Sequence, residues 1–405
     1  MLQKIIHRIL VRRHFWRNAS FSEIAELYAS RVLRMLAIYI AASFMSIYLY
    51  QQGYSVWMIG AFWAITYLFK AIVALPLAAL AAWFGPKHGI LVANILYIPS
   101  MIAFALAPNY GPWLMIFVVI FQGTSSALYS ISYGIDFSKV KSVAHAGKEI
   151  AFMNMVEKIT TGLSPLIGGV IAYLLGPQVV LIIAAFLFTL AALPLLRTSE
   201  QVVPRQKLDF RGFPWHLVRP NIVAHMAYGV DVFTSGTVWS LFTAIFIIGI
   251  AADNQVYAVN GALMSVVVFA ALASSYTYGK LIDRNKGREL LKYAAIGNAI
   301  THFFRPVIGS PLAVAGLNIA NETATTGYSM SYTRGIFDNA DLSGRRTTYL
   351  GIVEVLSNLG AAAGAGILII LTMYLNDQKA LEIFFYIAAF IVLMIATARF
   401  PLYRK

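Results

Sequence analysis

Cysteine is absent from the 405-residue sequence, so disulfides, thiolate zinc sites and a cysteine nucleophile are excluded. The patterns His-Glu-x-x-His, Gly-x-Ser-x-Gly and Gly-x-x-x-x-Gly-Lys-Ser/Thr are missing as well. These patterns are typical of zinc peptidases, serine hydrolases and P-loop nucleotide-binding proteins. We therefore expect that the protein is not an enzyme, needs no cofactor or metal, and does not use ATP as its energy source.

Charged residues are scarce, at 12% of the chain, whereas 59% of the residues are hydrophobic. A soluble core cannot bury so much apolar side chain, so lipid must cover the excess. Acidic residues are fewer than basic ones, 17 against 31, but the basic residues lie between hydrophobic stretches rather than on one soluble face. The sequence predicts an all-α integral membrane protein whose surroundings are the lipid bilayer, with no nucleic-acid partner.

Stretches of the about 20 apolar residues that a membrane span needs follow one another along the chain. The twelve predicted spans are residues 31–52, 56–84, 89–107, 112–136, 149–175, 178–197, 221–249, 256–281, 290–308, 311–335, 347–375 and 380–399.

Segment 198–220 is polar and basic and contains three prolines, so we expect it to be a cytoplasmic linker. It separates a predicted N-terminal six-helix bundle, 31–197, from a C-terminal bundle, 221–405. Residues 1–30 are predicted to be a basic amphipathic segment at the membrane interface, with a new helix starting near Phe21.

Basic residues are distributed unequally between the two sets of loops. If the N-terminus is cytoplasmic, every inner loop carries lysine or arginine, whereas the outer loops carry Lys379 alone. Positive charge stays on the cytoplasmic side. We therefore expect both termini to lie in the cytoplasm. We also expect the protein to reside in the inner or plasma membrane and to be a monomer.

The two halves share a sequence repeat. The pattern Tyr-Ser-x-Ser-Tyr begins at Tyr129 and again at Tyr328, 199 positions later (328 minus 129). Such repeats in membrane proteins indicate a transporter whose site lies between two halves that move against each other.

A loop between the eighth and ninth spans carries a family resemblance. Gly279, Asp283, Arg284, Gly287 and Arg288 resemble the loop signature Gly-x-x-x-Asp-Arg-x-Gly-Arg of the major facilitator superfamily, with one extra residue before the second glycine. The resemblance implies twelve helices in two pseudo-symmetric six-helix bundles and transport by alternating access. It also implies a gating loop that steadies the outward-open state.

Other parts of the superfamily pattern are incomplete. The first-half counterpart of the loop, around residues 82–87, lacks the acid and the arginine, so we expect an asymmetric latch. Pro165, Gly168 and Gly169 resemble the Pro-x-x-Gly-Gly part of a signature associated with exporters. Close helix packing through small residues explains these glycines equally well.

In this superfamily the first, fourth, seventh and tenth helices line the central cavity, and the same four spans here carry polar residues three or four positions apart. A polar helix face in a bilayer must look toward protein or water. Hydrogen bonding between helices without ligand contact is the alternative. We therefore expect a substrate cavity lined by Tyr39, Ser43, Gln122, Ser126, Tyr129, Tyr133, Ser235, Trp239, Asn318, Asn321, Thr325 and Tyr328.

Ionisable side chains inside a span cost about 3 kcal/mol each and need a reason. Asp231 and Glu322, midway along cavity-lining spans, are the strongest candidates to bind a proton or a cationic substrate group. Asp231 has no cation within four positions on its own helix. The remaining coupling candidates lie on spans that form the interface between the halves: Lys70, Glu157, Lys158 and Glu354.

An ion pair such as Lys70 with Glu354 is expected to form in one access state and break in the other, with a permanent pair as the alternative. We also expect Lys158 or Lys70 to neutralise Glu157 and Glu354. His302 and Arg305, near the outer end of the ninth span, are expected to reach the lipid headgroups.

The sequence thus predicts a secondary active transporter that moves a small organic or amphipathic solute by alternating access, coupled to protons. One alternative is a lipid or amphiphile flippase of the same fold, which requires a lateral opening between spans 5 and 8 or between spans 2 and 11. The other is a non-transporting receptor or scaffold, which has no need of costly carboxylates.

Overall fold

A computed structural model describes residues 21–140, 146–196, 207–249 and 254–403. Within these ranges, side chains are described except those of residues 21–25, 43, 137–140, 146–150, 152 and 153. The predicted interfacial segment before residue 21 lies outside the described residues, and so does the side chain of Ser43.

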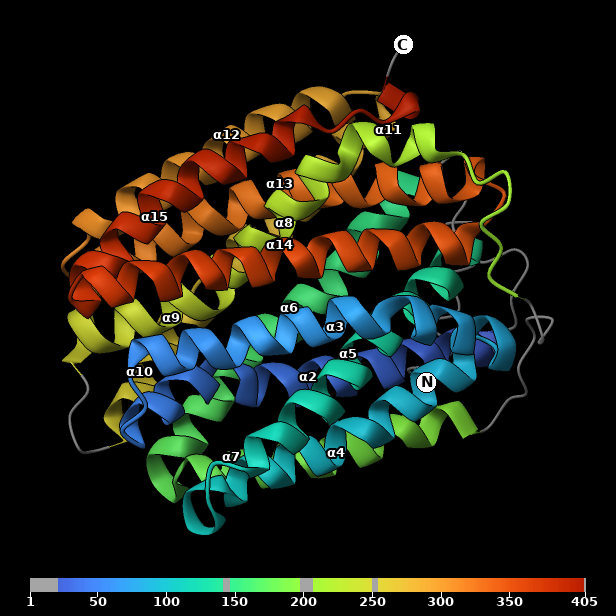
Figure 1. The fold of residues 1–405 in the computed structure, drawn as a ribbon. Coiled ribbons are helices and arrows are strands. Elements are labelled where there is room, and N and C mark those ends of the chain that lie inside the picture. Colours follow the sequence, from blue (N-terminus) through green and yellow to red (C-terminus); the bar gives the residue numbers. More distant parts are fainter. Residues whose placement is uncertain (1–20, 141–145, 197–206, 250–253, 404–405) are drawn as a thin grey trace, which may run out of the picture.

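The described chain is built of helices (Figure 1). The first six spans are α2 (Phe21–Gln51), α3 (Val56–Phe84), α4 (Pro86–Tyr110), α5 (Leu114–Val140), α6 (Ala146–Leu175) and α7 (Pro177–Ala192), which η1 (Leu193–Leu196) extends. The linker region carries the short helices η2 (Trp215–Leu217) and η3 (Arg219–Asn221).

The seventh span joins α8 (Ile222–Phe233), η4 (Thr234–Val238), α9 (Trp239–Phe242) and η5 (Thr243–Gly249), and the eighth joins α10 (Gln255–Ser265) and α11 (Val268–Asp283). The remaining spans are α12 (Gly287–Phe304) with η6 (Arg305–Val307), α13 (Pro311–Leu342), α14 (Arg346–Tyr374) and α15 (Asp377–Leu393) with η7 (Met394–Thr397). The helix η8 (Pro401–Tyr403) follows the last span.

Twelve spans are therefore present, as predicted. Ten of the described helical segments are long and apolar enough to cross a membrane on that criterion alone, and α12 and α13 are the two others. Helix α12 begins with charged residues, and α13 carries the predicted polar stripe. Helix α2 begins at Phe21, where the sequence predicted a helix start ahead of the first span. One predicted boundary is wrong, because α13 continues to Leu342 rather than ending at 335.

Glycine–proline pairs mark several helix ends. Gly85 ends α3 with φ 97°, and Pro86 starts α4. Gly176 has φ 92° ahead of Pro177 in α7. Glycine tolerates positive φ at a helix end, and proline has no amide hydrogen to lose in a first turn. These pairs explain why the turns between spans can be so short.

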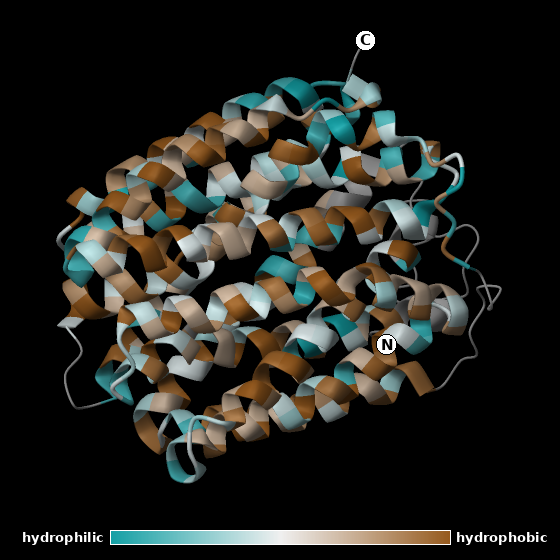
Figure 2. Cartoon of the chain, in the orientation of Figure 1, coloured by the Kyte–Doolittle hydropathy of each residue, from teal (hydrophilic) through white to brown (hydrophobic). Residues whose placement is uncertain are grey.

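The early helices and the late helices form two groups, which meet along α3 with α14 and along α6 with α10 and α11 (Figure 1). Apolar residues run along the outer helices, and polar residues gather at the ends of the bundle (Figure 2). Large apolar side chains such as Ile72, Phe269 and Phe390 are exposed, as lipid contact requires. We call the end that holds residues 207–220 the linker side, and the other end the far side.

Candidate functional site

A cavity of about 810 Å³ lies between the two groups of helices. All four spans expected to line it contribute residues, including Tyr39 from α2, Tyr129 from α5, Trp239 from α9 and Asn321 from α13. The other predicted residues found in its wall are Tyr133, Ser235, Asn318, Thr325 and Tyr328. The six coupling candidates line it as well: Lys70, Glu157, Lys158, Asp231, Glu322 and Glu354.

Gln122 and Ser126 do not line this cavity, so their prediction as cavity residues is wrong. Both hydrogen-bond the hydroxyl of Tyr97 on α4. At this level α3 covers α5, because Phe69 lies so close to Gly123 that a Cβ there would be 2.6 Å from its ring. The polar stripe of α5 therefore has two parts. Gln122 and Ser126 form hydrogen bonds to a neighbouring helix, whereas Tyr129 and Tyr133, further along the helix, line the cavity.

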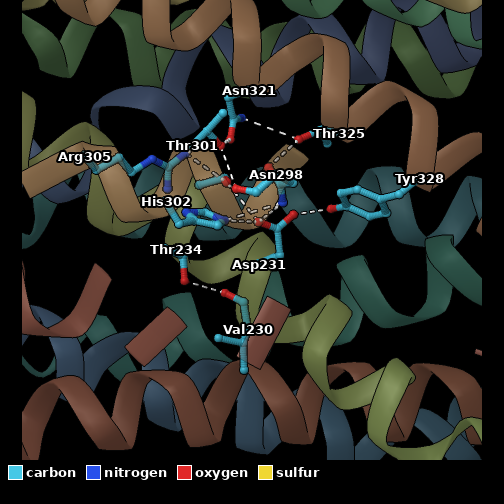
Figure 3. A network of polar contacts seen from close by, with 11 residues as sticks. Val230, Asp231, Thr234, Asn298, Thr301, His302, Arg305, Asn321, Thr325 and Tyr328 are labelled. Atoms are coloured by element: carbon cyan, nitrogen blue, oxygen red, sulfur yellow. Dashed lines mark hydrogen bonds and ion pairs between the residues drawn. The ribbon is translucent and has the colours of Figure 1, made fainter. Parts of the chain in front are cut away.

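Asp231 is 2% exposed and is the centre of a polar network (Figure 3). Its Oδ1 accepts a hydrogen bond from Asn298 at 2.9 Å and lies 2.6 Å from Nε2 of His302. The hydroxyl of Ser235 donates to Oδ1 at 3.2 Å, and that of Tyr328 donates to Oδ2. Side chains from the seventh, ninth and tenth spans thus surround this one carboxylate.

The network continues to Arg305, whose Nη2 donates to Ser235 at 3.1 Å and to Asn321 at 3.2 Å. His302 and Arg305 are 0% and 1% exposed, so the prediction that they reach the headgroups is wrong. Helix α12 packs on α13 and turns this face inward. The spacing of Asn298, His302 and Arg305, four and then three positions, would have indicated one polar helix face.

An ion pair crosses between the two halves. Lys158 Nζ lies 2.7 Å from Oε1 of Glu322, which also accepts a hydrogen bond from Thr326 at 2.9 Å. The expectation that Lys158 neutralises Glu157 is therefore wrong. The partner of Lys158 comes from α13, far away in sequence.

Glu157 is paired instead with Arg31, whose Nε donates to Oε1 at 2.6 Å. Arg31 also donates to the hydroxyl of Tyr129 at 3.2 Å and lies 3.6 Å from the ring centre of Tyr133. The sequence interpretation missed Arg31, which lies at the start of the predicted first span. The signal available for it was a charged residue eight positions, about two helical turns, before Tyr39 in the polar stripe of that span.

Glu354 accepts hydrogen bonds from Ser130 at 2.7 Å and from Asn358 at 2.8 Å. Lys70 interacts with it electrostatically but forms no ion pair with it in the described part of the chain. The expected Lys70–Glu354 salt bridge is thus absent from this arrangement. Ser130 lies on α5 and Glu354 on α14, so this contact also joins the halves.

The family model of the Major Facilitator Superfamily matches residues 27–333, which is more than half of the chain. The chain belongs to this superfamily. The superfamily consists of transporters and not of enzymes. No curated protein sequence matches the chain.

Solved structures of superfamily members have the same fold. The E. coli fucose:proton symporter FucP is 14% identical, with a TM-score of 0.65 over 93% of this chain and 98% of that chain. FucP in the outward conformation is 13% identical, with a TM-score of 0.62 over 93% and 100%. The human organic anion transporter MFSD10 is 14% identical, with a TM-score of 0.66 over 92% and 99%.

The superfamily loop signature forms the turn between α11 and α12. Gly279 and Asp283 lie in the last turns of α11, and Arg284 ends that helix. Gly287 begins α12, and a Cβ there would be 2.5 Å from the ring of Tyr403, so glycine permits this contact. Arg288 follows in the first turn of α12. In the first half an ion pair of Lys87 with Glu26, at 3.2 Å, lies near the corresponding turn.

The exporter-like glycines lie where helices approach most closely. A Cβ on Gly168 would be 2.2 Å from the carbonyl oxygen of Ile40, and one on Gly169 would be 2.4 Å from that of Tyr257. Gly169 therefore lets α6 of one half touch α10 of the other. Close packing accounts for both residues.

Proposed function

We propose that this superfamily member is a secondary active transporter that moves a small organic or amphipathic solute and couples the movement to protons. One observation carries the proposal: Asp231 lies in the wall of the cavity between the halves, and the buried imidazole of His302 contacts its carboxylate. Pockets of about 300–1,000 Å³ accommodate small organic ligands. A carboxylate beside an imidazole can take up and release a proton as its surroundings change.

Alternating access requires contacts that form and break. On the far side the hydroxyl of Tyr257 donates to Gln51 at 2.5 Å, and α6 touches α10 at Gly169. The cavity extends from Asn318 toward Phe337 on the linker side. We infer that bundles 31–197 and 221–405 rotate about this cavity, and that the Lys158–Glu322 ion pair breaks when the far side opens.

The flippase alternative needs a lateral opening that the described helices do not show. Helix α3 lies against α14 both at Gly60, whose Cβ would be 3.2 Å from Ile369, and at Gly351, whose Cβ would be 3.0 Å from Ala78. Helix α6 lies against α11 at Gly162, where a Cβ would be 2.3 Å from Val268. Entry from the ends of the bundle is therefore favoured.

The test begins with a thermal-shift screen of solutes on the purified protein, followed by uptake into proteoliposomes under an imposed pH gradient. Asp231→Asn and Glu322→Gln keep side-chain shape but remove the titratable charge. We expect gradient-driven accumulation to fall in at least one variant while exchange without a gradient survives. Glu382→Gln, outside the cavity, is the control. Unchanged accumulation in both variants and in the double variant would overturn the coupling role.

We further propose that both termini are cytoplasmic and that the protein resides in the inner or plasma membrane, on the basis of the one-sided basic loops. The cysteine-free chain permits a direct test with Leu208→Cys in the linker. This cysteine should resist an impermeant thiol reagent in intact cells and react in inverted vesicles. Reaction in intact cells would reverse the orientation.

A further inference from the structure

We propose that Arg305 binds a carboxylate group of the transported solute, and that this binding favours protonation of the Asp231–His302 pair. The inference rests on the proposed transport function and adds the substrate class, a small organic carboxylate.

Arg305 is 1% exposed and lies in the cavity wall. Its Nη2 donates to two neutral oxygens, on Ser235 and Asn321. Its Nε and Nη1 are buried and have no hydrogen-bond partner, and among the described residues no carboxylate lies within ion-pair distance of it. A buried donor without a partner costs free energy. A ligand that supplies an acceptor to such a donor removes this cost, which makes its binding more favourable.

The planar guanidinium matches a carboxylate better than other acceptors, because the two groups form a pair of parallel hydrogen bonds. Each edge of the guanidinium combines Nη2 with one of the two unpartnered nitrogens. A carboxylate at either edge would replace one neutral oxygen and satisfy one unpartnered donor. The rings of Trp239 and Phe385, with centres 5.0 and 5.6 Å from the guanidinium carbon, stabilise the cation through its π contacts.

The charges of the cavity wall balance when the cavity is empty. Two of its cations, Arg31 and Lys158, are paired with acids of their own. Arg305 has only an electrostatic interaction with Asp231, and Ser235 connects the two through hydrogen bonds of 3.1 and 3.2 Å. An added carboxylate leaves one negative charge in excess, which a proton on the Asp231–His302 pair removes.

The groups that face Asp231 determine where this proton can go. They are His302 from α12, Tyr328 from α13, Arg305 from η6, and Tyr228 from α8, the helix that carries Asp231 itself. At neutral pH the tyrosine hydroxyls and the arginine already hold their protons, so among these groups only the carboxylate and the imidazole can take one up. By linkage, solute binding should promote proton uptake, and lower pH should tighten solute binding.

The first experiment compares carboxylates with uncharged amides of the same shape on the purified protein. The probes are lactate with lactamide, phenylacetate with phenylacetamide, and glucuronate with glucuronamide, and the measurement is binding followed by the unfolding temperature. We expect at least one carboxylate to bind while its amide does not. Arg305→Gln should weaken that binding by about 10- to 100-fold, the value of a charge-assisted hydrogen bond. Arg305→Lys should retain part of it.

Arg34→Gln is the matched control, because Arg34 is also a buried arginine but does not line the cavity. It should lower stability without changing the preference for carboxylates. If Arg305→Gln does not fold, the double variant Arg305→Gln/Asp231→Asn, which removes both charges, takes its place. The proposal is overturned if no carboxylate binds better than its amide, or if loss of the Arg305 charge leaves binding unchanged.

The second experiment measures proton uptake on binding, with a pH indicator in weak buffer. The parent protein should take up a proton with each carboxylate, whereas Asp231→Asn should bind without uptake. Neutral solutes that accumulate equally in the parent and in Arg305→Gln would preserve the transport function and overturn the carboxylate site. Carboxylates that bind at Arg305 with proton uptake but never accumulate in proteoliposomes would preserve the site and overturn the transport function.

Discussion

The two halves of the molecule bury opposite charges at corresponding places. In the first half, Arg34 of α2 is 1% exposed and donates to Asn94 of α4 at 2.8 Å and to Ser125 of α5 at 3.2 Å. Its guanidinium carbon lies 3.9 Å from the ring centre of Tyr129. Arg34 has no ion-pair partner among the described residues.

In the second half, Asp231 of the seventh span occupies the comparable position, with Asn298 of α12 and Tyr328 of α13 around it. Tyr328 is the repeat equivalent of Tyr129. The asparagine uses its oxygen toward Arg34 in one half and its nitrogen toward Asp231 in the other. The same arrangement of helices therefore holds a cation in one half and an anion in the other.

The difference is one of chemistry rather than of architecture. An arginine stays charged at every physiological pH, so the Arg34 site can only be a fixed structural feature. A carboxylate beside an imidazole can change its charge, and the Asp231 site also lines the cavity. Repetition of a helical scaffold thus allows one copy to remain structural while the other acquires a titratable centre.

The largest expected effect is a difference between the two buried charges: loss of Arg34 should mainly reduce stability, whereas loss of the Asp231 charge should mainly reduce proton coupling. Arg34→Ala should lower the free energy of unfolding by about 3–4 kcal/mol, since it leaves a cavity and deprives Asn94 of a donor. Asp231→Asn should lower it by less than about 2 kcal/mol and yet abolish pH-driven accumulation. SDS-induced unfolding and proteoliposome uptake measure the two properties. Equal destabilisation by both variants would show that the Asp231 site is structural as well.

Exchanging each asparagine for aspartate should have opposite consequences. Asn94→Asp places an acid beside Arg34 and should change stability by less than about 1 kcal/mol. Asn298→Asp places two carboxylates together and should cost about 1–3 kcal/mol at neutral pH. The folded variant then binds more protons than the unfolded chain, so its stability should fall as pH rises. A flat pH dependence of unfolding would contradict the close placement of the two groups.

Removal of the Tyr328 hydroxyl should shift the pH dependence of transport. Tyr328→Phe takes a donor from the charged form of Asp231, so the proton is held more readily. A charge-assisted hydrogen bond of about 1.5–3 kcal/mol corresponds to an upward shift of about 1–2 pH units in the midpoint of accumulation. Uptake measured from about pH 5 to 8, the range in which an ordinary histidine changes its charge, tests this shift. An unmoved midpoint would mean that the hydroxyl does not stabilise the carboxylate.

The corresponding change in the first half should be the smallest. Tyr129→Phe retains the aromatic ring next to Arg34 and loses only the acceptor for Arg31. We expect a loss of about 0.5–1.5 kcal/mol in stability, the net value of one hydrogen bond, and no shift in the pH midpoint. A shift as large as that of Tyr328→Phe would make the two halves equivalent.

Much of the fold could be predicted from composition and periodicity. Long apolar stretches determine where helices form in a bilayer, and Gly85–Pro86 and Gly176–Pro177 determine where they end, because these are local properties of the chain. The repeat of Tyr129 at Tyr328 indicated two related halves. Nine of the cavity residues were found from their spacing on four spans, since a polar face must turn inward.

Partners of the charged groups could not be predicted in this way. Lys158 lies next to Glu157 in sequence but pairs with Glu322, and Asp231 receives its imidazole from His302 on another helix. A helix presents neighbouring residues in different directions, so the tertiary packing chooses the partner from a distant segment. The sequence alone determined the membrane class, the number of spans and the polar faces. Only the placement of α8 beside α12 and of α6 against α13 decided which charges meet, because those distances depend on helix rotation rather than on local sequence.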